Sequence, residues 1–213
     1  MRKKEKVLKI KEIFNIHYSE ADTTLDYKSP FELMVATQLA AQCTDARVNT
    51  VTPALFAKYP DVYAFARADI TELEALVRPT GFFRNKAKNL KAAAQVLLED
   101  FGGEVPGTME ELLTIPGVGR KTANLLLGDV FGKPAIVVDT HAGRISRRIG
   151  LTKNTDPYKV EMDLIKIVPA DYSNRFCHQL VLHGRAICTA RSPKCPVCPI
   201  SEYCDYWRKV SKV

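Results

Sequence analysis

The sequence predicts an all-helical protein, and three features of its 213 residues lead to this prediction. Helix-start signals recur along the chain, each a Ser, Thr or Asp placed three residues before a Glu. After these signals, apolar residues recur at helical spacing, and no segment alternates as a half-buried strand does. Residues 135–138 form a short apolar run, for which a strand is the alternative to the buried connector that we expect. Residues 188–213 lack the helical pattern and are rich in Cys and Pro.

The individual helices follow from these signals in chain order. Near the N-terminus, Val7, Ile10 and Phe14 form one apolar stripe with lysines around it, the pattern of an amphipathic helix. Ser29 and Glu32 form a capping box with a proline at the first helical position, which opens an apolar helix. The predicted helices span residues 5–17, 30–41, 70–77, 85–100, a short segment between Thr108 and Pro116, and residues 120–130, 141–149, 157–167 and 173–187.

The composition narrows the class of protein. Lys and Arg number 31 against 24 Asp and Glu, which gives a net charge of +7. This balance favours a polyanionic partner such as nucleic acid over an ordinary basic protein. No stretch approaches the ~20 apolar residues of a membrane span, and no apolar signal region follows the basic start. We therefore expect a cytoplasmic protein with no membrane partner, in which cysteines serve metal or redox chemistry rather than disulfides.

Four cysteines near the C-terminus have the spacing C-x6-C-x2-C-x5-C. Structural zinc usually takes two close Cys pairs, and only one close pair is present. The wider spacings suit the larger perimeter of a [4Fe–4S] cluster better than zinc or a disulfide framework. The candidate ligands are Cys188, Cys195, Cys198 and Cys204. Cys43 and Cys177 lie outside this set, and we expect both to be small buried apolar residues.

A glycine-rich hairpin joins two predicted helices over residues 113–123. Gly117 and Gly119 allow positive φ and let the backbone approach another molecule closely. The next helix begins there, so its free N–H groups favour an anion. The hairpin is therefore predicted to grip phosphates without reading sequence, and a plain helical hairpin is the alternative.

Lys121 lies in the first turn of that second helix, where the helix dipole disfavours a positive charge. It is either one more phosphate contact or a nucleophilic amine, because the helix end favours the neutral form. Asp139 follows an apolar run and precedes a predicted helix. Such a residue is most often an N-cap, but its carboxylate could also stabilise positive charge developing on a substrate.

These motifs closely resemble those of the endonuclease III family, in the helix-hairpin-helix DNA glycosylase superfamily. The matching segments are residues 115–124, Val138-Asp139-Thr140-His141 and the four-cysteine loop, and the resemblance covers residues 5–207. It implies two all-helical lobes with double-stranded DNA bound across the cleft between them. One is a six-helix barrel of residues 23–133, with the helix-hairpin-helix motif at about 108–131. The other is an iron–sulfur cluster domain of residues 1–22 with 134–213.

The resemblance also implies a bifunctional activity in base excision repair on damaged or abasic DNA. Lys121 would attack C1′ of the damaged nucleotide, expel an oxidised pyrimidine and form a Schiff base. β-Elimination would then cut the strand 3′ to the lesion, with Asp139 as the catalytic carboxylate. We expect a monomer that associates with the nucleoid if the source is a prokaryote.

Further residues match DNA-contacting positions of the family. Gln42 would fill the gap left by the flipped base, and Phe82 would wedge into the base stack. The alternatives are a polar helix end for Gln42 and packing against the next helix for Phe82. The resemblance adds these further DNA contacts: Gly117, Val118, Gly119, Arg120, His141 and Arg144. Arg144, Arg147 and Arg148 either face the phosphates or form a solvated basic face.

Two other functions are compatible with parts of this pattern. One is an adenine or mismatch glycosylase, but such relatives lack a lysine at the position of Lys121 and the adenine-specific ones carry a further C-terminal domain. The other is a non-catalytic DNA-binding module, which would need neither Asp139 nor Gln42. The family usually has a bulkier residue where Ala142 and Gly143 stand, which leaves the base preference open.

Overall fold

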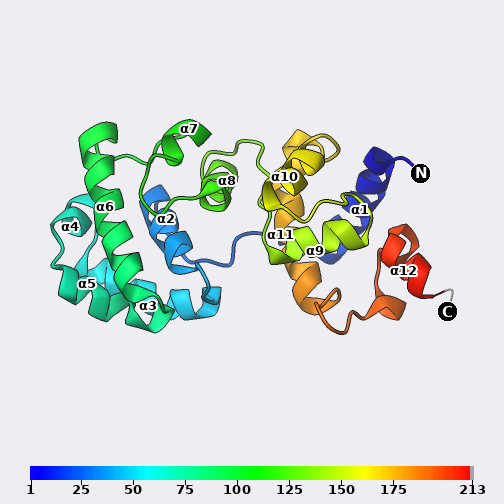
Figure 1. The fold of residues 1–213 in the computed structure, drawn as a ribbon, viewed down its shortest axis with the longest axis horizontal. Helices are drawn as coiled ribbons and strands as arrows, with labels where there is room; N and C mark the ends of the chain where they lie inside the picture. The colour runs from blue at the N-terminus through cyan, green and yellow to red at the C-terminus, as the bar shows by residue number, and fades with distance from the viewer. Residues whose placement is uncertain (212–213) are drawn as a thin grey trace. The chain divides into compact units, whose positions relative to one another are not determined.

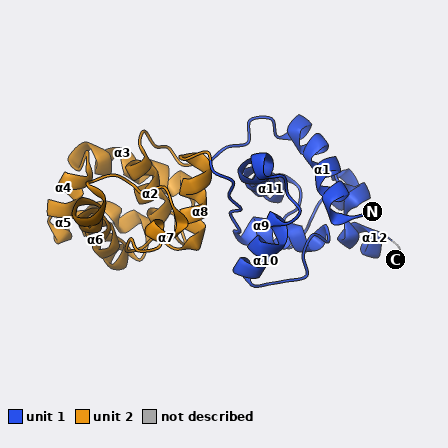
Figure 2. Ribbon diagram, turned by 90° about the horizontal axis from the view of Figure 1, so that it is seen from above, with its two compact units in different colours: residues 1–23, 133–213 blue, residues 24–132 orange. Residues whose placement is uncertain are grey.

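The computed structural model describes residues 1–211, and no strand occurs in that range (Figure 1). The chain divides into two compact units (Figure 2). Residues 24–132 form one unit, called the hairpin unit below. Residues 1–23 and the chain from Lys133 onward form the other, called the cysteine unit. The all-helical prediction is confirmed.

The hairpin unit is built around α2 (Pro30–Leu39) and α6 (Phe83–Phe101), and α6 packs against α2, α4 and α5. Nearly every residue of α2 is buried, as expected for a helix that is apolar on all sides. The remaining elements are α3 (Asp45–Lys58), α4 (Val62–Arg67), α5 (Ile70–Val77), η1 (Arg78–Thr80), α7 (Met109–Leu112) and α8 (Arg120–Asp129).

Three predicted helix starts in this unit are confirmed by their hydrogen bonds. The Ser29 side chain accepts from the Glu32 N–H at 3.2 Å, and Asp69 accepts from two N–H groups of α5. Thr108 accepts from the N–H of Glu111 at 3.3 Å. These caps fix where the helices begin, because each satisfies an N–H group with no partner inside its helix.

Two helices of this unit, α3 and α4, were not predicted. Pro53 lies inside α3, and its neighbours Val51 and Thr52 are β-branched, so the intrinsic helix propensity is low. Tertiary packing overrides that propensity, since Val48, Val51 and Leu55 are buried. The short α12 (Asp205–Val210) of the cysteine unit was missed as well, because residues 188–213 show little helical pattern.

The cysteine unit gathers α1 (Lys3–His17) with the helices from the second half of the chain. The apolar stripe of α1 is confirmed, because Val7, Ile10 and Phe14 are fully buried. The other elements are α9 (Thr140–Arg148), α10 (Pro157–Ile165), η2 (Ala170–Tyr172), α11 (Ser173–Ala186), η3 (Cys195–Val197), η4 (Ser201–Tyr203) and α12. α9 packs against α11.

Residues 135–138 form the predicted connector rather than a strand. The Ala135 N–H donates to Ser173 Oγ at 3.0 Å, and the Val137 N–H donates to Cys177 Sγ at 3.2 Å. Cys177 is buried as expected, whereas Cys43 is only half-buried. These bonds to α11 satisfy a buried backbone that has no strand partner.

A buried lysine joins the two ends of the chain within the cysteine unit. Lys6 Nζ donates to the Ile149 carbonyl and to the Asp205 carboxylate, both at 2.7 Å. Asp205 approaches so closely that a side chain at Gly150 would collide with it.

Within residues 1–211, no helix combines the length and apolar character needed to cross a membrane.

Candidate functional site

The hairpin between α7 and α8 contacts α2. Gln38 is buried on α2, and its Nε2 donates to the Pro116 carbonyl at 3.3 Å. Gly117 has φ of 79°, and a Cβ there would lie 2.9 Å from Gln38 Cδ and 3.0 Å from Asn89 Cβ. Gly119 is extended, with φ of −97°, so only Gly117 uses the left-handed freedom that both glycines allow. The hairpin is therefore a close-fitting turn at Gly117 and an open one at Gly119.

α8 presents its N-terminus at this hairpin. Gly119 is the N-cap residue, and no side chain caps the helix. Thr122, Ala123 and Leu126 bury the opposite face, while Lys121 is exposed. An uncapped helix start beside an exposed ammonium suits a phosphate group. Val118 is buried and could reach such a group only through its backbone.

Asp139 is the N-cap of α9, as one interpretation of the sequence expected. Its Oδ1 accepts the Ala142 N–H at 2.7 Å. No hydrogen bond from the described residues to its Oδ2 is present in the structure. One oxygen therefore fixes the helix start while the other stays available for chemistry. Asp139 belongs to the cysteine unit and Lys121 to the hairpin unit.

Gln42 and Phe82 share an unusual backbone. They are the two non-glycine residues with positive φ in the described chain, at 55° and 50°. Both are exposed, Phe82 to 62%, so packing of Phe82 against the next helix does not account for its position. Gln42 lies beyond the end of α2 and before α3, so it is not a helix residue. Strained, exposed residues of this kind concentrate at functional sites.

Arg144 and Arg148 of α9 bond the backbone of the cysteine loop. Arg144 Nη2 donates to the Cys188 carbonyl at 2.8 Å, and Arg148 donates to the carbonyls of Thr189 and Ala190, both at 2.7 Å. Both guanidinium groups thus bond carbonyls of the cysteine loop, and the expected phosphate contact of Arg144 stays a prediction. Arg147 is exposed. The spacing of four residues between Arg144 and Arg148 was the signal that they share a helix face.

His141 is directed into the same unit. Its Nδ1 lies 3.1 Å from Arg144 Nη2, and a Cβ at Gly184 of α11 would collide with the His141 ring. Gly184 therefore lets α9 and α11 approach closely. The expected DNA contact of His141 stays a prediction.

The four C-terminal cysteines line one small pocket. All four are free thiols. Burial raises the pKa of Cys198 to about 11, and burial also raises the pKa of Cys195 and Cys204. Four converging thiols are a soft donor set that suits an iron–sulfur cluster, whose positive irons would favour the thiolate form.

Two basic groups lie against these sulfurs. Arg148 Nη1 donates to Cys188 Sγ at 3.3 Å. His183 Nε2 lies 3.6 Å from Cys198 Sγ, and its Nδ1 lies 2.9 Å from the Tyr18 hydroxyl. Burial lowers the pKa of His183 to about 4. A neutral imidazole and a guanidinium beside thiolate sulfurs are typical partners outside the ligand set of a metal centre.

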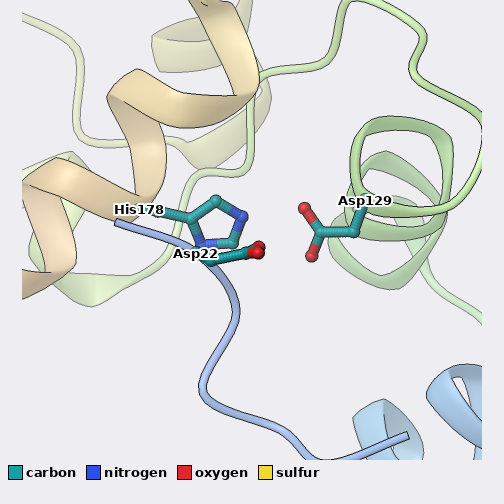
Figure 3. Close-up of side chains that lie close together, drawn as sticks. All are labelled: Asp22, Asp129 and His178. Atoms are coloured by element: carbon teal, nitrogen blue, oxygen red, sulfur yellow. The ribbon is translucent and has the colours of Figure 1, made fainter. Parts of the chain in front are cut away.

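Sequence reasoning missed a polar pair in the cysteine unit. A carboxylate oxygen of Asp22 and a ring nitrogen of His178 on α11 lie within 4.8 Å of each other (Figure 3). The two residues are far apart in the sequence and match no motif, so no local signal could have found them. We assign this pair no role.

Comparisons with known proteins assign two segments of this chain to known families. Residues 35–170 match the HhH-GPD superfamily of base excision DNA repair proteins. Residues 188–204, the span of the four cysteines, match the iron–sulfur binding domain of endonuclease III. The fold and the hairpin thus define a helix-hairpin-helix base excision DNA repair protein.

The similarity to individual proteins is closer still. Endonuclease III of Synechocystis is 51% identical over 203 residues, covering 95% of this chain and 93% of that protein. A non-covalent endonuclease III–DNA complex has a TM-score of 0.93 at 38% identity, covering 100% of both chains. A trapped covalent endonuclease III–DNA intermediate has a TM-score of 0.93 at 39% identity, covering 99% of this chain and 100% of that one.

The chain belongs to the endonuclease III family. By this membership it is a bifunctional glycosylase and lyase of base excision repair, and its four-cysteine loop carries an iron–sulfur cluster.

Proposed function

We propose that this protein removes oxidised, ring-saturated pyrimidines from double-stranded DNA through a Schiff base on Lys121. The observation that carries the proposal is the exposed position of Lys121 in the first turn of an uncapped helix, directly after the Gly117 turn. Phosphates gripped at that helix end would place a neighbouring nucleotide within reach of the amine. A similar endonuclease III has been trapped covalently on DNA, as an amine nucleophile allows.

The chemistry then follows in two stages. The Lys121 amine attacks C1′, the glycosidic bond breaks, and the base leaves with its bonding electrons and a proton. The amine loses its protons as the sugar ring opens, and a Schiff base between Nζ and C1′ results. Loss of a proton from C2′ then expels the 3′ phosphate, which cuts the strand.

Asp139 supplies the carboxylate of this reaction. Its Oδ1 is occupied by the Ala142 N–H, so Oδ2 would either take a proton from Lys121 or stabilise the positive charge on the sugar. The cluster, when bound by the four cysteines, supplies iron–sulfur bonds that tie the loop of residues 188–204 together. Because one chain contains every residue of this scheme, we propose that it acts as a monomer.

Base flipping would require a residue to fill the gap in the duplex. Gln42 and Phe82 are exposed at two turns of the hairpin unit, which supports assigning them this role. Saturated pyrimidines have lost aromatic stacking, so extruding them costs less than extruding an intact base. A permissive pocket could therefore select them.

Borohydride trapping tests the proposal. Wild-type protein should cross-link to an abasic duplex and cleave a thymine-glycol duplex. Lys121→Gln should abolish both while DNA affinity stays within about tenfold, because Lys121 is one cation among many phosphate contacts. A Lys121→Gln protein that still cross-links would place the nucleophile elsewhere.

A second duplex tests the substrate. Adenine opposite 8-oxoguanine should be excised with a much lower kcat/KM than thymine glycol. The opposite preference would reject the oxidised-pyrimidine assignment and favour an adenine-specific glycosylase.

A further inference from the structure

Two exposed turns of the hairpin unit each contain a residue with a strained backbone, and contacts within the unit must hold each turn in place. Gln42 follows the end of α2, and Phe82 follows the end of η1. Neither residue is a glycine, yet both have positive φ. Such a conformation costs free energy and persists only where the surrounding structure imposes it.

Lys86 of α6 bonds both turns from inside the unit. Its side chain is buried, and Nζ donates to the Leu39 carbonyl and the Thr80 carbonyl, both at 2.8 Å. Leu39 is the last residue of α2, three residues before Gln42. Thr80 is the last residue of η1, two residues before Phe82. One ammonium group therefore links the bases of both turns.

The chemistry of these bonds makes the link strong. Carbonyls at the ends of helices have no partner inside the helix and carry the negative end of the dipole. Burial lowers the pKa of Lys86, with the nearby Cys43 thiol acting in the opposite direction. Because burial removes water from the ammonium, the hydrogen bonds to the two carbonyls are the main compensation for its lost hydration. Removing the ammonium would leave two buried acceptors unsatisfied.

We propose that Lys86 is a positioning residue that fixes the distance between the Gln42 turn and the Phe82 turn, so that both side chains enter the duplex together. The inference rests on the proposed function of Gln42 and Phe82. Lys86 would touch neither DNA nor the reacting atoms. It would act on extrusion of the base, which precedes attack by Lys121.

Lys91 offers a matched control on the same helix. Its Nζ also donates to a carbonyl at a helix end, that of Ala68, at 2.8 Å. Ala68 is the C-cap of α4 and adjoins neither turn. Lys86→Met and Lys91→Met thus remove the same kind of bond from one helix, but only the first should release the turns.

The experiment compares two substrates in the holoprotein. Lys86→Met should slow excision from a thymine-glycol duplex about tenfold or more, since a misplaced positioning group has effects of this size or larger. It should cleave a preformed abasic site within about threefold of wild type, because no base remains to be extruded. Fluorescence of 2-aminopurine beside the lesion should report slower flipping. Lys91→Met should match wild type in all three measurements.

Two further variants keep the test decisive. Lys86→Arg retains a cation that can reach carbonyls, so it guards against a folding failure of Lys86→Met. It should slow excision by less than tenfold and leave abasic cleavage unchanged. In a Gln42→Ala/Phe82→Ala background, Lys86→Met should add less than about twofold, because coupled residues are non-additive.

Several results would overturn the inference. Equal losses on both substrates in Lys86→Met and Lys86→Arg would indicate general structural damage, and full excision by Lys86→Met would indicate no role. An undiminished effect in the double-alanine background would show that Lys86 does not act through the turns. If wild-type protein itself excises no pyrimidine lesion, the proposed function fails first and takes this inference with it.

Discussion

In the hairpin unit, α2 is buried on nearly every side by apolar neighbours, whereas residues 188–204 of the cysteine unit bury only Ile200 and Cys204. Apolar burial stabilises the first region, and the free energy that it contributes is proportional to the apolar area removed from water. In the second region, guanidinium groups of α9 donate hydrogen bonds to loop carbonyls. Its four thiols line one pocket, and a bound metal cluster would tie them together. The comparison indicates that the hairpin should be insensitive to loss of the cluster, while the loop should depend on the cluster.

Removing one cluster ligand should have the largest effect and should damage one unit only. We expect Cys198→Ser to lose most of its iron, from about four per chain, and to lose amide protection over residues 188–204. Iron analysis and hydrogen exchange would measure this. Cys43→Ser, outside the ligand set, should keep its iron. Equal loss of protection in the hairpin unit would contradict the comparison.

Asp139 tests whether the cysteine unit contributes chemistry as well as structure. Asn can still cap α9, so Asp139→Asn should lower kcat by about 10²–10³-fold with little change in Tm. Asp139→Ala should lower kcat as much and also cost about 1 kcal/mol of stability through the lost cap. Single-turnover kinetics and thermal denaturation would separate the two. An active, stable Asp139→Asn protein would reduce Asp139 to a cap.

The arginines of α9 sharpen the comparison within the cysteine unit. Arg148→Met should destabilise the holoprotein by about 2 kcal/mol and speed iron release, because two loop carbonyls lose a charged donor. Arg147→Met removes an exposed guanidinium from the same helix and should change stability by less than about 0.5 kcal/mol. Urea denaturation and iron-release rates would measure both. Similar destabilisation by the two variants would argue against a special role for Arg148.

The two hairpin glycines provide the last pair of substitutions. Gly117→Ala should cost about 1–3 kcal/mol, because alanine is strained at positive φ and its Cβ would meet the Gln38 side chain. Gly119→Ala should be nearly neutral for stability, since a Cβ there meets nothing within 4 Å. Denaturation and duplex-binding titrations would test this pair. Equal costs for the two alanines would mean that the turn at Gly117 is not the constrained one.

Signals that act within one helical turn were predictable from the sequence. The caps at Ser29, Asp69 and Thr108 each bond a group two or three residues away. The ligand spacing and the hairpin glycines are also local, so the cluster loop and the position of Lys121 could be inferred early. Long-range packing could not be predicted from the sequence. Sequence reasoning therefore missed α3, which forms despite Pro53.

Contacts between distant residues explain what sequence reasoning missed at the site. Lys86 reaches Leu39 across 47 positions, and Arg148 reaches Thr189 across 41. No pattern in the chain links either pair. Sequence reasoning gave Lys86 no role and left Arg148 on a phosphate-facing or solvated face, because burial of an ammonium or guanidinium depends on carbonyls that only the fold brings near.

The pairing of Lys6 with Asp205 has a consequence for synthesis of the chain on the ribosome. α1 is synthesised before the other helices of its unit, but its Lys6 pairs with a carboxylate that lies 199 positions later in the chain. The hairpin unit is one continuous segment and can fold meanwhile. At about 5–20 residues per second, residues 133–205 take about 4–15 s to appear. Until those residues appear, Val7, Ile10 and Phe14 lack part of the core that buries them in the finished fold, so the cysteine unit can be completed only after nearly the whole chain has been made.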